Sequence, residues 1–218
     1  MTIELTELAT LIKSRRSIRA WQDKAVSADL LLQAIEIATW APSGGNQQNW
    51  RFYIILNRDT IQAIADAVQS SADQIASWTE AGPGGATAGS GRRAGFFRNA
   101  PAAIAVAAAQ YQSAVDEVLA THEKTDPLAA QIRQWRNLAD SRIQSVASAI
   151  AYLLLILHQM GLGAVWMTGP VQAKREIEKL LRVPPEMDII AFIPVGYPAE
   201  SPVTRGRRAV GEVSEVVR

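Results

Sequence analysis

Residues 141–160 read SRIQSVASAIAYLLLILHQM, the most apolar long segment of the sequence. Apolar side chains fall on nearly every face of the helix that this segment predicts, rather than on one stripe. Its nearly apolar run, residues 146–157, is interrupted by Ser148 and is too short to span the ~30 Å core of a bilayer. A helix of this kind lies inside the core or in a subunit interface. We therefore expect residues 141–160 to be buried, either within the chain or between subunits.

Shorter predicted helices and strands surround this segment. Apolar spacing of three and four residues predicts helices over residues 5–14, 59–78 and about 171–182, and another after the N-cap residue Ser27. A further helical region is broken near Pro127. Apolar runs predict strands over residues 51–56, 101–109, 164–167 and 188–195. This irregular mixture, with more helix than sheet, indicates the α+β class. Because no repeat or linker is apparent, we expect one domain over residues 1–218.

The composition restricts the chemistry. The chain has 218 residues, a net charge of +1 and no cysteine, which excludes disulfides, thiolate nucleophiles and cysteine-ligated metals. His122 and His158 are the only histidines, and neither HExxH nor GxSxG occurs. We therefore expect neither a metal site nor a serine hydrolase triad. The basic residues comprise 17 Arg and 5 Lys, a bias toward the guanidinium group that grips phosphates and carboxylates with two parallel hydrogen bonds.

Neither the N-terminus nor the glycine-rich segment predicts a targeting or nucleotide-binding element. Residues 1–13 carry Glu4 and Glu7 and no unbroken apolar run, unlike a signal peptide. We therefore expect a cytoplasmic protein that does not bind membranes. Residues 82–91 contain five glycines, but they follow a predicted helix and precede a strand, the reverse of a phosphate-binding loop. We interpret them as a mobile loop.

Three polar segments carry the strongest functional signal. Residues 14–19, SRRSIR, place three arginines directly after a helix, where they repel one another unless an anion lies between them. A solvated basic turn explains this segment equally well. Residues 41–50, APSGGNQQNW, contain four consecutive amide side chains, which an ordinary loop does not need. Residues 204–208, TRGRR, form a second arginine cluster that could be a solvated terminus. Together they predict a ligand with a phosphate at one end and a planar, hydrogen-bonding ring at the other.

These segments, in this order and spacing, resemble the nitroreductase family of FMN-dependent oxidoreductases. The resemblance rests on residues 15–19, 41–52, 161–170 and 195–200 and extends over residues 8–213. It implies a three-layer α+β fold with a central mixed sheet flanked by helices. It also implies a homodimer with exchanged C-terminal tails, the long apolar helix at its centre, and two FMN sites shared between the subunits.

The resemblance implies a cofactor site built from four segments. Arg15, Arg16 and Ser17 would hold the FMN phosphate and ribityl chain, Arg19 would reach the flavin near N1 and O2, and Arg205 and Arg207 would close on the phosphate. Thr168 and Gly169 would lie beside flavin N5. From the other subunit, Pro42, Ser43, Gly44 and Asn46 would pack along the ring and ribityl chain. Asn49 stands where the family usually has proline, a departure that predicts a less rigid loop.

The implied reaction transfers hydride from NAD(P)H through flavin N5 to a small-molecule acceptor such as a nitroaromatic or a quinone. The cofactor carries this chemistry, so no catalytic side chain is expected. Residues 82–95 and 111–140 would roof the substrate pocket, with Phe96, Phe97 and Trp135 as candidate pocket aromatics.

Three alternatives remain. The same fold could perform dehalogenation, flavin fragmentation or azoline oxidation, or it could bind flavin without turnover. A nucleic-acid-binding module is disfavoured because no basic stripe with interleaved aromatics is present.

Overall fold

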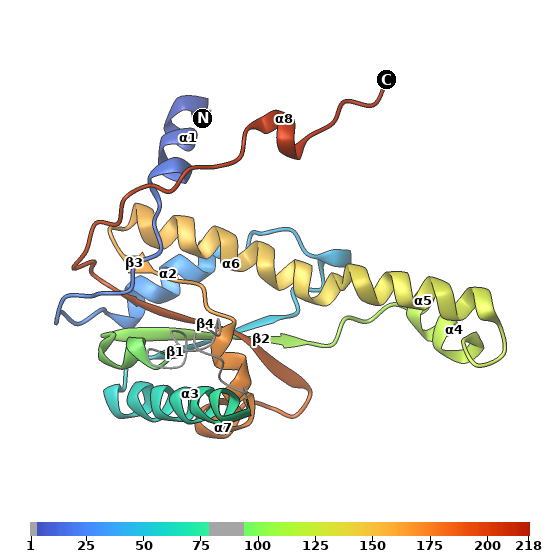
Figure 1. Cartoon of the computed structure of the whole chain (residues 1–218), viewed down its shortest axis with the longest axis horizontal. Coiled ribbons are helices and arrows are strands. Elements are labelled where there is room, and N and C mark those ends of the chain that lie inside the picture. Colours follow the sequence, from blue (N-terminus) through green and yellow to red (C-terminus); the bar gives the residue numbers. More distant parts are fainter. Residues whose placement is uncertain (1–3, 79–93) are drawn as a thin grey trace.

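The computed structural model describes residues 4–78 and 94–218 and has three layers, with a sheet between two sets of helices (Figure 1). The predicted glycine-rich loop, residues 82–91, lies outside the described residues. The helices are α1 (Leu5–Ser14), α2 (Ala28–Ala38), α3 (Arg58–Trp78), α4 (Ala114–His122), α5 (Pro127–Ala139), α6 (Ser141–Gln159), α7 (Lys174–Leu181) and α8 (Val210–Val213). The strands are β1 (Trp50–Ile55), β2 (Ala102–Ala109), β3 (Gly163–Ala164) and β4 (Met187–Gly196). The α+β class is confirmed.

The sheet has the order β1-β2-β4-β3, and the pairs of named strands are antiparallel. The mixed sheet implied by the resemblance is therefore an antiparallel one among the described strands. An isolated parallel bridge between Ser17 and Ala164 lies outside these strands and joins the segment after α1 to the β3 edge. Strand β2 is buried along almost its whole length and is rich in alanine. Side chains this small let helices approach both faces of the sheet closely.

Two hydrophobic clusters lie on opposite faces of the sheet. One contains the inner faces of α2 and α6 together with Ile104 and Val106 of β2. The other contains α3, α7 and the 3₁₀ helix η3 (Phe96–Asn99), packed against Ala103 and Ala105. Alternate residues of β2 therefore serve alternate cores, as the two-residue repeat of a strand requires. Phe97 is fully buried in the second cluster, and Phe96 stacks on Trp21.

Helix α6 is the apolar helix predicted over residues 141–160, and only one of its faces is buried in the chain. Val146, Ile150, Leu153 and Leu157 are fully buried against the sheet and α2, while Tyr152 on the opposite face is 44% exposed. By length and composition alone, residues 127–159 could cross a membrane. Within this stretch the left-handed residue Asp140 ends α5 and caps α6, and core packing accounts for the apolar inner face.

Several predicted boundaries differ from the structure. The strand expected over residues 164–167 is reduced to β3 and a separate bridge between Met167 and Phe192. The helix expected over 171–182 is a 3₁₀ turn, η4 (Gly169–Ala173), followed by α7. The C-terminal tail contains one helical turn, α8, which no predicted element covered. The spacing of apolar residues predicted that these elements exist better than it predicted where they end. The ends depend on contacts with other parts of the fold.

Candidate functional site

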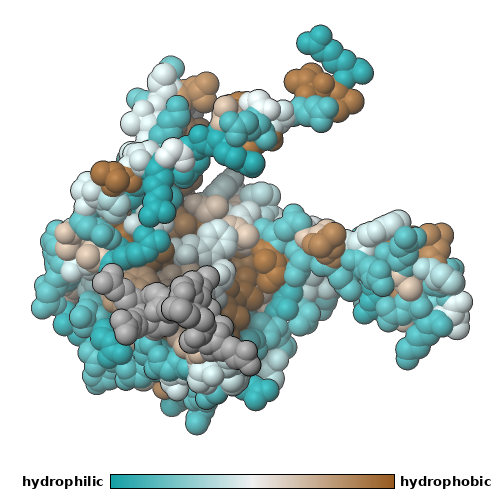
Figure 2. All heavy atoms as spheres, in the orientation of Figure 1, coloured by the Kyte–Doolittle hydropathy of each residue, from teal (hydrophilic) through white to brown (hydrophobic). Residues whose placement is uncertain are grey.

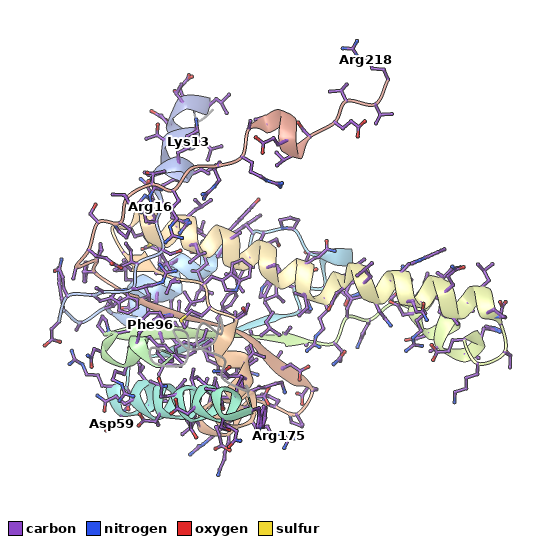
Figure 3. All side chains as sticks on the ribbon, viewed as in Figure 1. Lys13, Arg16, Asp59, Phe96, Arg175 and Arg218 are labelled. Atoms are coloured by element: carbon purple, nitrogen blue, oxygen red, sulfur yellow. The ribbon has the colours of Figure 1, made fainter. Side chains whose placement is uncertain are left out.

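Arginines from the two ends of the chain line one cavity of about 440 Å³. The C-terminal segment passes the end of α1 beside Arg16 (Figure 3). The predicted phosphate-binding residues of both clusters are therefore brought together. The lining residues are Arg15, Arg16, Ser17, Arg19, Pro202, Val203, Thr204, Arg205 and Arg207.

Hydrogen bonds connect the two ends of the chain beside this cavity. The Arg16 guanidinium donates to the carbonyls of Lys13 at 2.6 Å and Arg15 at 2.7 Å, and also to the hydroxyl of Thr204. A Glu200 carboxylate oxygen accepts from the backbone N–H groups of Arg19 and Ala20. The segment after α1 and the segment after β4 thus form one wall. Sequence reasoning missed Thr204 and Glu200, because a lone hydroxyl or carboxylate in a tail carries no periodic signal.

The cavity is lined by several arginine side chains and carries positive charge. Among the described residues, none of the cavity's arginine side chains is in an ion pair. Burial lowers the pKa of Arg15, and the charges of Arg16 and Arg207 lower it further. Arginine nevertheless stays protonated, so these like charges remain and favour a multiply charged anion between them.

His158 closes the neighbouring end of α6. One ring nitrogen lies 2.9 Å from the Ser14 hydroxyl, one residue before the arginines. Burial lowers the pKa of His158, and repulsion from Arg15 and Arg16 adds to this effect. His158, near the C-terminal end of α6, therefore contacts the segment that carries the arginines, a relation that only the structure shows.

Thr168 and Gly169 lie farther along the same edge of the sheet. The backbone N–H of Ile18 donates to the carbonyl of Ala164 at 3.1 Å, beside the cavity. Met167 then exchanges two backbone hydrogen bonds with Phe192, and both Thr168 and Gly169 are exposed. At about 3.3 Å per residue when fully extended, Thr168 lies at most about 13 Å from Ala164. One edge can therefore present the arginines to one end of an extended ligand and residues 168–169 to the other.

The loop containing Pro42, Ser43, Gly44 and Asn46 lies near the opposite end of α6. The Ser148 hydroxyl donates to the Pro42 carbonyl at 2.7 Å, and Gly44 N–H donates to the Ser145 hydroxyl at 3.0 Å. With a rise of about 1.5 Å per residue, the serines lie about 15–20 Å along α6 from its histidine end. Within one chain, therefore, this loop does not join the arginine cavity.

Asn49, which stands where the family usually has proline, has a structural role in this loop. Its side chain is 6% exposed and donates to the carbonyls of Ala109 at 3.2 Å and Arg142 at 3.3 Å. Proline could make neither bond. Of the candidate pocket aromatics, Phe97 belongs to the core and Trp135 is 58% exposed on α5.

Comparison with known proteins gives a consistent family assignment. The sequence model that defines the Nitroreductase family matches residues 12–197 of this chain. A protein of Methanothermobacter thermautotrophicus named putative NADH dehydrogenase/NAD(P)H nitroreductase is 29% identical over 89% of this chain and 78% of its own. An iodotyrosine deiodinase of Thermotoga neapolitana is 28% identical over 88% of each chain.

Solved structures share the fold. A BluB-like flavoprotein of Clostridium difficile superposes with a TM-score of 0.82 at 24% identity and full coverage of both chains. An oxidised iodotyrosine deiodinase bound to FMN and 3-iodo-L-tyrosine gives a TM-score of 0.70 at 24% identity, with 97% of each chain covered.

Proposed function

This chain belongs to the nitroreductase family, and on that premise we propose that it is an FMN-dependent oxidoreductase that transfers hydride from NAD(P)H to an acceptor such as a nitroaromatic or a quinone. The observation that carries the proposal is the cavity where arginines from both ends of the chain meet, none of them in an ion pair within the described part of the chain. The arginine cavity would hold FMN by its phosphate, and the bound flavin would supply the hydride-transfer chemistry. The chain's own residues bind and orient this group.

The donor set of the cavity suits a phosphate ester. Arg15, Arg16 and Arg207 supply charge, and the hydroxyls of Ser17 and Thr204 add donors at the same wall. A phosphate of nearly two negative charges favours several guanidinium partners. Arg205 completes the phosphate end, while Arg19 at the rim is the candidate contact for the pyrimidine edge of the ring.

We propose that a second copy of the chain completes the site with Pro42, Ser43, Gly44 and Asn46. Figure 2 shows apolar residues on the C-terminal tail, away from the body of the chain. They include Val210 and Val213, which are 76% and 56% exposed, and α6 also has an uncovered face. Exposed apolar surface of this extent favours burial against another chain. A homodimer with exchanged tails would cover these faces and bring the loop to the partner's arginine cavity.

Reductive dehalogenation is the second candidate function. It is supported by the match to an iodotyrosine deiodinase over 88% of both chains. Both reactions use the same cofactor site, so the acceptor distinguishes them.

The test is an absorption spectrum of purified full-length protein, before and after anaerobic addition of NADH or NADPH. We expect a yellow dimer, bleaching by a nicotinamide, and recovery of colour with menadione or a nitroaromatic. Recovery with 3-iodotyrosine and release of iodide would favour dehalogenation instead. Bleaching with neither nicotinamide would support flavin binding without turnover. A colourless protein that also fails to take up added FMN would refute the proposal.

A further inference from the structure

The amide run Asn46–Asn49 is not explained by the proposed flavin site, which uses only Asn46. Gln47 and Asn49 contact the base of the arm formed by α4 and α5, which projects from the body in Figure 1. The Gln48 side chain instead donates to Asn46 within the loop. Residues 110–113 lead into this arm and residues 140–142 lead out of it. The loop and both ends of the arm therefore meet in one place.

Gln47 binds the entry to the arm through a reciprocal pair of hydrogen bonds. Its Nε2 donates to the carbonyl of Gln112, and the backbone N–H of Gln112 donates to its Oε1 at 2.9 Å. The main-chain ladder of β1 and β2 ends nearby, where Ala109 N–H donates to the Asn49 carbonyl at 2.8 Å. A side-chain amide has the same donor and acceptor as a peptide group. Gln47 thus extends the pairing of the two segments beyond the last backbone hydrogen bond.

Asn49 binds the entry and the exit of the arm together. Its Nδ2 donates to the carbonyls of Ala109, before the arm, and Arg142, after it. The Arg142 side chain closes the same junction by donating to the carbonyls of Ala108 at 2.7 Å and Ala109 at 3.0 Å. Asn49 is buried, so these bonds form where water cannot compete for them.

The loop itself is held in an unfavourable backbone conformation. Asn46 and Gln48 have φ angles of +53° and +47°, a left-handed region that L-residues avoid. Such a conformation persists only where surrounding contacts fix it. The Tyr111 ring, at the entry to the arm, also packs on Gly44: a Cβ atom there would lie 2.9 Å from the ring. The conformation of the loop and the position of the arm therefore depend on each other.

We propose that Gln47 and Asn49 are positioning residues that couple flavin binding on the loop to the orientation of the α4–α5 arm. The inference rests on the proposed FMN site. Because coupling between two sites is reciprocal, FMN that binds the loop restricts the arm, and a fixed arm strengthens FMN binding. The arm carries exposed apolar residues on α5, including Trp135 and Leu138. The orientation of the arm therefore determines which part of the protein this apolar face of α5 can cover.

The test is hydrogen–deuterium exchange of residues 110–142 in full-length protein, stripped of flavin and then saturated with FMN. In the wild type, FMN should slow exchange at both ends of the arm by about fivefold or more. Gln47→Ala should still bind FMN but lose most of that protection. Gln112→Ala is the matched control, since the hydrogen bonds that join Gln112 to Gln47 use only the Gln112 backbone. It should behave as the wild type.

Each outcome decides between the two proposals. Equal protection in the wild type and Gln47→Ala would overturn the coupling and leave the FMN assignment intact. Wild-type protein that fails to bind FMN would overturn both. Loss of protection in Gln112→Ala as well would overturn the specific role of Gln47. If Gln47→Ala does not fold, Gln47→Glu takes its place: it keeps the acceptor for Gln112 N–H and loses the donor, so partial protection is expected. Full protection in Gln47→Glu would overturn the proposal.

Discussion

The guanidinium of Arg16 donates a hydrogen bond to the hydroxyl of Thr204, a residue 188 positions away along the chain. This contact joins the segment after α1 to the C-terminal tail through side chains of the protein itself. It organises donors from both segments around one cavity. A site arranged in advance loses less conformational entropy when its anion binds.

Removing one cavity arginine should weaken FMN binding. A hydrogen bond to a charged group contributes about 1.5–3 kcal/mol, so Arg207→Ala should raise the Kd for FMN by about 10- to 100-fold. Titration of apoprotein followed by flavin fluorescence measures this change. Arg208→Ala is the matched control, because Arg208 does not line the cavity. Equal losses in both variants would indicate a general effect of charge rather than a site.

Filling the cavity with an anion should raise the pKa of His158. Its pKa is lowered by burial and by repulsion from Arg15 and Arg16, and a bound phosphate offsets the repulsion. NMR titration of the ring protons, with and without FMN, measures the shift, and His122 on α4 provides the second histidine signal. An unchanged titration midpoint for His158 would place the phosphate elsewhere.

The same depressed pKa makes stability depend on pH. The unfolded chain binds a proton at His158 more readily than the folded chain does, so the ligand-free protein should lose stability as pH falls through and below about 6.5. His158→Gln should remove this part of the dependence. Urea denaturation at pH 7.5 and 5.5 tests it, and an equal pH effect in the two proteins would contradict it.

Asp188 should stabilise the fold at neutral pH. Lys174 and Arg142 pair with its carboxylate and lower its pKa from 3.8. Because the folded pKa is depressed, the stabilisation is present above this value and is lost as pH falls through the folded pKa. The carboxylate is partly exposed, so Asp188→Asn should cost about 1–2 kcal/mol at pH 7 and progressively less in acid. Denaturant unfolding of Asp23→Asn, whose ion pair with Arg58 is exposed, provides a control with an expected cost near zero.

Gly163→Ala should disturb both the fold and the cavity. A Cβ atom at Gly163 would lie 2.6 Å from Cγ1 of the buried Ile18, which adjoins Ser17 and Arg19. Overpacking of this kind costs about 1–3 kcal/mol, and it should also weaken FMN binding. Thermal unfolding and flavin titration measure the two effects. Gly211→Ala has open space around its new methyl group and should change neither quantity.

Local sequence predicted most elements because their signals are local. The apolar repeat of α3 and the Ser27 cap of α2 require only neighbouring residues, and both are present in the structure. The strand expected over residues 164–167 depended instead on partners: Ala164 pairs with Val195, whereas the next bridge occurs only at Met167. A β-rich composition does not specify which backbone groups find a partner.

The sequence alone determined the secondary-structure elements, the fold class and the residue types suited to a phosphate. Apolar periodicity and side-chain chemistry can both be read from neighbouring positions in the chain. Tertiary structure alone decided that Arg16 meets Thr204, that Asn49 joins both ends of the arm, and that the loop at Gly44 lies far from the arginines of its own chain. Such contacts depend on how the whole backbone folds. Hydrogen bonds form, and charge repulsion is strong, only between groups that folding brings close together.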